Sequence, residues 1–181
     1  MQWRLTLEQE SCGNIDALKM KMESWLSKKG EGKLKTKPFS QEVHDACDPP
    51  ARDAVIDWVF HEWGWKAYPN EDKYGVDLIV KRFGSIVGYI EVETRDWLRE
   101  DTKCPYNTIH VAKRKEKLLN NRMPTVFFAV TRDFKNAYWC KADAIQRSPV
   151  KEIPNKAVKE GEYFYDVPIN KFHYVNLELP F

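Results

Sequence analysis

Residues 74–94 constrain the fold of this chain more than any other stretch, because they carry the pattern of two paired strands. Apolar side chains recur at every second position in the segments 76–81 and 90–93, and a period of two is typical of β-strands. Gly84 lies between the two segments and readily adopts the positive φ of a tight turn. The stretch therefore predicts a β-hairpin.

Three carboxylates occupy polar positions of this predicted hairpin. With Gly84 at its centre, the hairpin places Asp77 opposite Glu91, and Glu93 lies on the same face one pleat further along. Like charges directly opposite each other destabilise a strand pair, and a hard cation such as Mg²⁺ or Mn²⁺ would relieve the repulsion. The pattern predicts a metal site. The alternatives are a solvated acidic strand face, or a register shifted by one residue that turns the acids apart.

The same stretch resembles the catalytic motif of the PD-(D/E)XK nuclease superfamily, whose members have the restriction-endonuclease-like fold. That motif is an Asp at the end of a turn-to-strand segment, followed by a neighbouring strand with the sequence (D/E)-x-K. Residues 75–77 (Gly-Val-Asp) and 91–93 (Glu-Val-Glu) fill these places. The departure is Glu93, which stands where the family usually has Lys, although a few restriction enzymes of the family use Glu-x-Glu.

The elements expected around the hairpin agree with this resemblance. Residues 51–63 are apolar around most of a helix, which implies burial on two sides, and Gly64 is placed to end that helix. Asp48 and the two prolines after it favour a helix start at that point. The other expected elements are a strand at 65–68, a basic helix at 110–119, a buried strand at 125–130 and a strand at 137–140.

The expected order is thus α-β-β-β-α-β plus one further strand. The resemblance implies an α/β fold with a central mixed sheet flanked by helices. Two more strand-like segments, 162–169 and 172–177, are expected to add edge strands or to cover the sheet.

The resemblance also implies roles for individual residues. Asp77, Glu91 and the Val92 carbonyl stand at the metal-ligand positions. The family often supplies a further acid from the first helix, and Asp53 fits that place. Asp57 and Glu62 on the same helix are its rivals, and each of these acids is also compatible with a solvated helix surface.

Two alternatives exist for the group that positions or deprotonates the attacking water: Glu93, or a lysine from a neighbouring element. Family members without Lys in the motif can recruit one, and the expected basic helix carries Lys113 and Lys115. Residues two apart on a helix point to different faces, so at most one of the two reaches the carboxylates. The other would meet a phosphate or solvent.

Residues 1–37 are expected to form an appendage to a nuclease domain at 38–181. Apolar residues between Ile15 and Leu26 have helical spacing, and the Lys- and Gly-rich segment 28–37 is typical of a linker. This linker is either solvated or in contact with a phosphate backbone.

Composition limits the classes of protein that need to be considered. The net charge is only +2, so a basic surface for nucleic acid has to be local. Four cysteines are widely spaced, which favours a reducing, cytoplasmic setting. His44 and Cys47 are the only pair with zinc-like spacing, and no second pair accompanies them. No apolar run reaches the ~20 residues of a membrane span, and no secretory leader is expected.

Together these features predict a Mg²⁺- or Mn²⁺-dependent endonuclease that hydrolyses phosphodiester bonds. The resemblance implies DNA as the substrate, since most of the family cleaves DNA, and a homodimer is left open. By analogy, a small nuclease of this kind fits a phage, mobile-element or defence setting. The alternatives are a catalytically inactive nucleic-acid-binding module on the same fold, and a structural or interaction protein.

Overall fold

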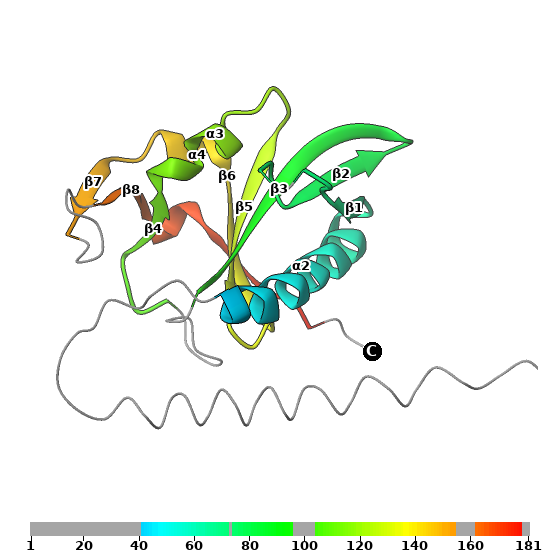
Figure 1. Ribbon diagram of the computed structural model, residues 1–181, viewed down its shortest axis with the longest axis horizontal. Helices are drawn as coiled ribbons and strands as arrows, with labels where there is room; N and C mark the ends of the chain where they lie inside the picture. The colour runs from blue at the N-terminus through cyan, green and yellow to red at the C-terminus, as the bar shows by residue number, and fades with distance from the viewer. Residues whose placement is uncertain (1–40, 73, 96–103, 155–161, 179–181) are drawn as a thin grey trace, which may run out of the picture. The chain divides into compact units, whose positions relative to one another are not determined.

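A computed structural model describes residues 41–72, 74–95, 104–154 and 162–178, with side chains from residue 48 onward (Figure 1). The chain divides into two units, Met1–Lys37 and Pro38–Phe181, and all the structure described below belongs to the second. The helical arm and basic linker predicted over 1–37 lie outside the described residues, and so do the side chains of His44 and Cys47.

A six-stranded mixed sheet forms the centre of the second unit. The strand order is β1-β2-β3-β5-β6-β9. The β3–β5 pair is parallel and the other pairs are antiparallel. The strands are β1 (Lys66–Pro69), β2 (Leu78–Arg82), β3 (Ser85–Arg95), β5 (Thr125–Thr131), β6 (Asn136–Lys141) and β9 (His173–Asn176).

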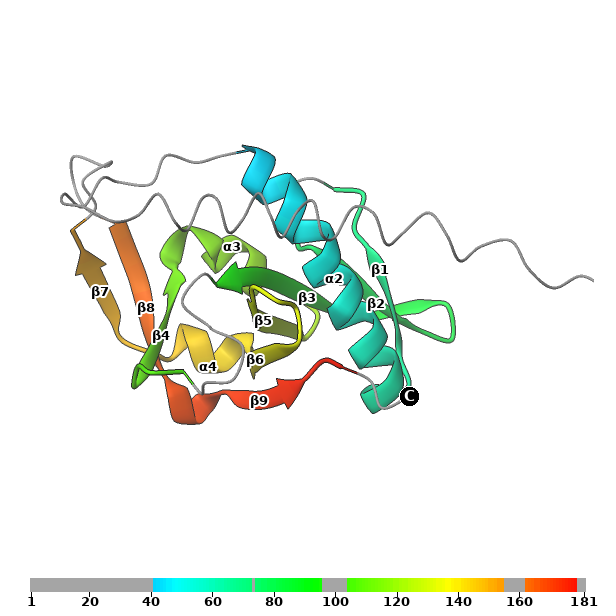
Figure 2. The same ribbon diagram turned by 90° about the horizontal axis from the view of Figure 1, so that it is seen from below.

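Helix α2 (Gln41–Trp63) packs against β1 and β3 and covers one face of this sheet (Figure 2). Its buried residues Val55, Trp58 and Val59 share one core with Ile90 and Phe128 from the sheet. A mixed sheet with helices confirms the α/β class that the sequence predicted.

A second, antiparallel sheet packs against the face of the main sheet that α2 does not cover. Its order is β4-β8-β7, formed by β4 (Thr108–Ala112), β8 (Glu162–Pro168) and β7 (Val150–Ile153). The inward residues Ile109, Val111, Tyr165 and Val167 pack with Phe127 of β5. The short helices are η1 (Lys113–Lys115), α3 (Glu116–Leu119), α4 (Ala142–Gln146) and η2 (Ile169–Lys171). Of the two C-terminal strands predicted, β9 joins the edge of the main sheet and β8 joins the second sheet.

The hairpin between β2 and β3 has the predicted register at its open end, next to Asp77 and Glu91. Leu78 pairs with Ile90, which aligns Asp77 with Glu91. The pairing shifts by one residue after Val80, towards the tip. The turn consists of two residues with positive φ, Phe83 at 51° and Gly84 at 80°. These values are typical of a type I′ turn, whose twist matches that of the strands.

The first helix is longer than the sequence suggested. It begins at Gln41, so Pro49 and Pro50 lie inside it. Proline lacks an N–H, and its ring disfavours a helical conformation in the residue before it, which is why the sequence favoured a helix start at this point. The predicted end is confirmed: Gly64 has a φ of 66°, and its N–H donates to the Phe60 carbonyl.

The basic helix predicted at 110–119 is wrong in its first part. Residues up to Ala112 belong to β4, where His110 pairs with Asp166 of β8. Ile109 and Val111 alternate with His110 and are fully buried. Pairing with a strand about fifty residues away in sequence decides this conformation, and such tertiary pairing commonly overrides local propensity. Helical structure starts only at Lys113.

Packing around β5 predicts where the fold is most sensitive. Phe128 is fully buried, and its ring lies 5.8 Å from that of Trp58. Phe128→Ala should lower the free energy of unfolding by about 3–5 kcal/mol, because it leaves a cavity in the core. Phe60→Ala is the matched control, since Phe60 is half exposed, and it should cost less than about 1 kcal/mol. Urea unfolding of both variants measures the difference, and equal losses would contradict this account of the core.

Candidate functional site

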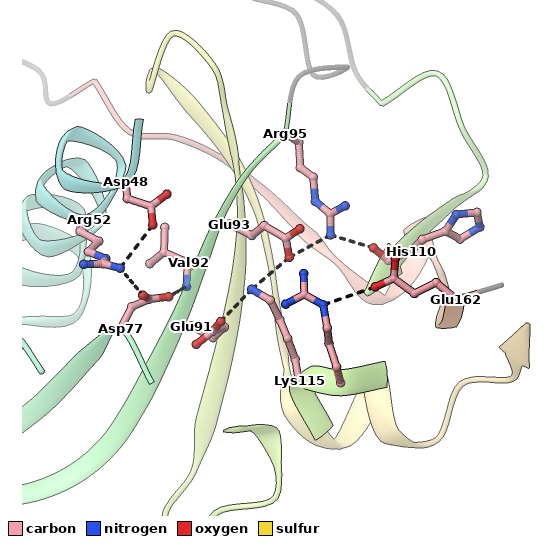
Figure 3. A network of polar contacts seen from close by, with 11 residues as sticks. Asp48, Arg52, Asp77, Glu91, Val92, Glu93, Arg95, His110, Lys115 and Glu162 are labelled. Atoms are coloured by element: carbon pink, nitrogen blue, oxygen red, sulfur yellow. Dashed lines mark hydrogen bonds and ion pairs between the residues drawn. The ribbon is translucent and has the colours of Figure 1, made fainter. Parts of the chain in front are cut away.

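Strand β3 directs a row of charged side chains towards the second sheet. Ile90 and Val92 face the core under α2. The alternation of the strand therefore places Glu91, Glu93 and Arg95 on the opposite face. Figure 3 shows polar contacts that join these three side chains to η1 and β4, and separate contacts that join the Val92 N–H of β3 to α2 through Asp77.

Asp77 is held at the point where β2 begins. Its Oδ2 accepts a hydrogen bond from the Val92 N–H at 2.8 Å. Its Oδ1 accepts one from Arg52 of α2 at 2.6 Å, and the same guanidinium lies 3.4 Å from Asp48. The N–H and C=O of a strand residue point to the same side, so the Val92 carbonyl also faces the Asp77 side of β3.

Lys115 connects the two glutamates. Its Nζ lies 2.7 Å from Glu91 Oε1 and 3.2 Å from Glu93 Oε2, and Figure 3 shows it reaching them from the short helix η1. Lys113 points elsewhere: its Nζ is 3.8 Å from Glu116 Oε2 and 5.7 Å from the centre of the Tyr165 ring. The two lysines therefore diverge as the sequence predicted, and Lys115 is the one that reaches the carboxylates.

Arg95 extends the network to the second sheet. Its Nη2 lies 3.2 Å from Glu93 Oε2 and donates to the His110 carbonyl at 2.7 Å. Arg52, Lys115 and Arg95 thus neutralise three carboxylates, that of Asp77 just before β2 and those of Glu91 and Glu93 in β3. Sequence reasoning missed Arg52 and Arg95, because both lie outside the motif and reach it only through the fold.

The three acids do not share one environment. Burial raises the pKa of Glu91 to about 7, with the charges of Asp77 and Glu93 adding to the rise and Lys115 opposing it. Burial also acts to raise the pKa of Glu93, but Arg95 and Lys115 outweigh it and the pKa is lowered. For Lys115, burial acts to lower the pKa, and the two glutamates outweigh it and raise the pKa. At neutral pH, Glu93 is therefore anionic and Lys115 is cationic.

The oxygen atoms at this site suit a hard divalent cation. Glu91 Oε2 is buried, and among the described residues it has no hydrogen-bond partner. The negative charge of Asp77 acts on Glu91, and carboxylate and carbonyl oxygens are ligand types that Mg²⁺ and Mn²⁺ accept. Within the described ranges, no three acidic, His or Cys side chains form a ready-made metal cluster. Arg52 and Lys115 already contact carboxylate oxygens of Asp77 and Glu91.

The other predicted ligand, Asp53, is not part of this network. It is exposed on α2, and in the described part of the chain no contact joins it to Asp77, Glu91 or Glu93. The neighbouring residue Arg52 contacts Asp77 instead. Because one residue corresponds to about 100° around a helix, this difference reverses the sign of the charge that α2 presents to the site.

A cavity of about 670 Å³ lies at a different place from the charged network. It is lined by Trp63, Trp65 and Trp139 together with residues 119, 121–126, 141–143 and 146. None of the residues in the charged network lines it.

In comparisons with known proteins, the sequence matches no family model, and no curated protein matches it. Among the described residues, no helix is both long and apolar enough to cross a lipid bilayer. The two cysteines whose side chains are described, Cys104 and Cys140, are free thiols.

The raised pKa of Glu91 predicts a pH dependence of stability. Its ordinary value is 4.5 and its folded value is about 7. Between these values, the folded state keeps a proton that the unfolded chain has released. The stability from this carboxyl is therefore fully present below about pH 4.5 and is lost as the pH rises through about 7.

Glu91→Gln cannot ionise, so it should not share this loss. Its free energy of unfolding relative to wild type should rise by up to about 3 kcal/mol between about pH 5 and pH 8. Urea unfolding in EDTA measures this difference, with Glu152→Gln as an exposed control that should show no trend. A flat difference for Glu91→Gln would contradict the buried environment assigned to Glu91.

Proposed function

We propose that this protein is a metal-dependent nuclease that hydrolyses phosphodiester bonds on a restriction-endonuclease-like fold. The observation that carries the proposal is the Lys115 ammonium, which lies between Glu91 and Glu93 although it comes from a different element. Lys115 would thus supply the lysine that the motif itself lacks. The order α2, β1, β2, β3, then η1–α3 and β5, supports the fold, with β4 as an insertion.

In this proposal, Asp77, Glu91 and the Val92 carbonyl hold Mg²⁺ or Mn²⁺. Such an ion lowers the pKa of a coordinated water and offsets the negative charge that develops on the phosphate. The protein positions the ligands: the Val92 N–H and Arg52 fix the Asp77 carboxylate, and β3 keeps Glu91 buried with one free oxygen. Asp53, which is exposed on α2, stays a prediction as a further ligand.

The directions of the pKa shifts divide the remaining roles. Glu93 is anionic at neutral pH because its pKa is lowered, so its carboxylate can accept a hydrogen bond from the attacking water and position it. Lys115 keeps its proton because its pKa is raised. It therefore donates hydrogen bonds and stabilises negative charge on the phosphate, rather than acting as a base. Phosphoryl transfer depends mainly on such positioning and charge neutralisation.

DNA is the proposed substrate, as the resemblance to the nuclease superfamily implies, and a homodimer stays a prediction. A second candidate is a nucleic-acid-binding module without catalysis. The ion pairs of Arg52 and Lys115 favour it, because these cations already neutralise the carboxylates that a metal would use.

A cleavage assay tests the proposal. Plasmid, linear duplex, single-stranded DNA and RNA are incubated with the full chain in Mg²⁺, Mn²⁺ or EDTA. We expect metal-dependent cutting. Asp77→Asn and Glu91→Gln should each lower the rate at least ~100-fold, because they remove ligands for the ion, and Lys115→Met should lower it by a similar factor through lost charge stabilisation.

Two exposed residues provide matched controls for these substitutions. Glu152→Gln and Lys171→Met lie outside the charged network and should cut at the wild-type rate. Cutting that persists in EDTA, or that survives in the Asp77 and Glu91 variants, would contradict the proposed site. Binding of nucleic acid without any cutting would favour the inactive module.

A further inference from the structure

The tip of the β2–β3 hairpin carries an aromatic side chain in an unusual conformation. Phe83 is 95% exposed, and its φ of 51° lies in the left-handed region, which bulky residues rarely adopt. The first position of a type I′ turn normally holds Asn, Asp or Gly. Figures 1 and 2 both show the tip of this hairpin standing clear of α2 and of the other strands.

Packing does not account for this phenylalanine. The one ring contact that it makes within the described residues is with the Arg82 guanidinium, 5.2 Å from the ring centre. A cation–π contact at an exposed site is weak. A strained backbone that carries an exposed aromatic ring is a reason to look for a function at that position.

The surface around Phe83 is cationic. Lys81 and Arg82 precede it on β2, and no acidic residue occurs between positions 78 and 90. Lys66 of β1 pairs directly with Lys81, and like charges opposite each other in a sheet repel. The Lys81 ammonium also lies 5.3 Å from the centre of the Tyr68 ring. A polyanion would relieve the repulsion between the two lysines, and the rings of Tyr68 and Phe83 offer apolar surface to bases.

The hairpin also links this tip to the candidate active site. Ser85 at the tip and Glu91 at the site belong to the same strand, β3. Their separation of six residues corresponds to about 20 Å at ~3.3 Å per residue. That distance is about six base-pair steps of a duplex at ~3.4 Å per step.

We propose that the β2–β3 hairpin is a contact for double-stranded nucleic acid, with Lys66, Lys81 and Arg82 binding phosphates while Phe83 inserts against a base pair. An apolar wedge flanked by cations is a known way of gripping and bending a duplex. This inference rests on the proposed function for its choice of partner, and it assigns duplex as the substrate form and the hairpin as the element that positions it.

Binding of a fluorescent duplex of about 20 base pairs to the full chain tests the inference. It is measured by anisotropy in EDTA, where cleavage plays no part. Phe83→Asn should weaken duplex binding roughly 5–10-fold through the loss of the inserted ring. It should also raise the melting temperature by roughly 1–3 °C, since Asn suits the turn. A residue kept for stability alone would lower the melting temperature when replaced.

The phosphate contacts have a separate readout. Lys81→Ala should weaken binding and reduce the slope of log affinity against log salt by about 1. Tyr163→Ala and Lys171→Ala are the matched controls, because both residues are exposed on elements outside the hairpin. Both should bind duplex as wild type does.

Unchanged duplex affinity in Phe83→Asn and Lys81→Ala would overturn the inference, even if the protein proves to be a nuclease. Hairpin-dependent binding without cleavage would support it while contradicting the proposed catalysis. The inference would also be overturned if the hairpin substitutions weakened binding of single-stranded DNA more than binding of duplex. A change in the oligomeric state of Phe83→Asn, measured by sedimentation, with duplex affinity intact, would identify the tip as a contact between copies of the chain instead.

Discussion

The contact between Lys115 and the two glutamates of β3 is the interaction on which the rest of the charged network depends. Glu91 has only 5% of its side chain exposed, and an ionised carboxylate in such a place is costly unless a cation compensates it. Lys115 comes from η1, so the position of that short helix determines whether the carboxylates are neutralised. Its two contacts, at 2.7 Å to Glu91 and 3.2 Å to Glu93, place one positive charge between two carboxylates that repel each other.

The second sheet has a role that follows from this constraint. Strand β4 leads directly into η1 and so fixes the position of the Lys115 backbone. The same strand offers the His110 carbonyl to Arg95, which in turn neutralises Glu93. The inner faces of β4 and β8 bury Ile109, Val111 and Val167 against the main sheet. Apolar packing of β4 thus supports the electrostatics of the site, while α2 fixes Asp77 from the other side through Arg52.

Sequence patterns gave the hairpin register, the buried strand β5 and the divergence of Lys113 from Lys115, because each follows from a local period or spacing. They did not identify Arg52, which contacts Asp77 from α2, since a helix that is apolar around most of its surface has no single stripe to fix its rotation. They also failed for His110, whose strand conformation depends on pairing with Asp166, far away in the chain. The role of Arg95 was not predictable for the same reason, because it donates to a backbone carbonyl of the other sheet.

Binding of Mn²⁺ measured by electron paramagnetic resonance tests the central claim most directly, since it needs neither a substrate nor turnover. The free-ion signal of Mn²⁺ is followed as the wild-type chain, Glu91→Gln and the control Glu152→Gln are added. The account predicts that wild type and the control remove one or two Mn²⁺ per chain from solution and that Glu91→Gln removes fewer. Equal binding by all three proteins, or no binding by wild type, would show that the carboxylates of β2 and β3 form ion pairs and no metal site.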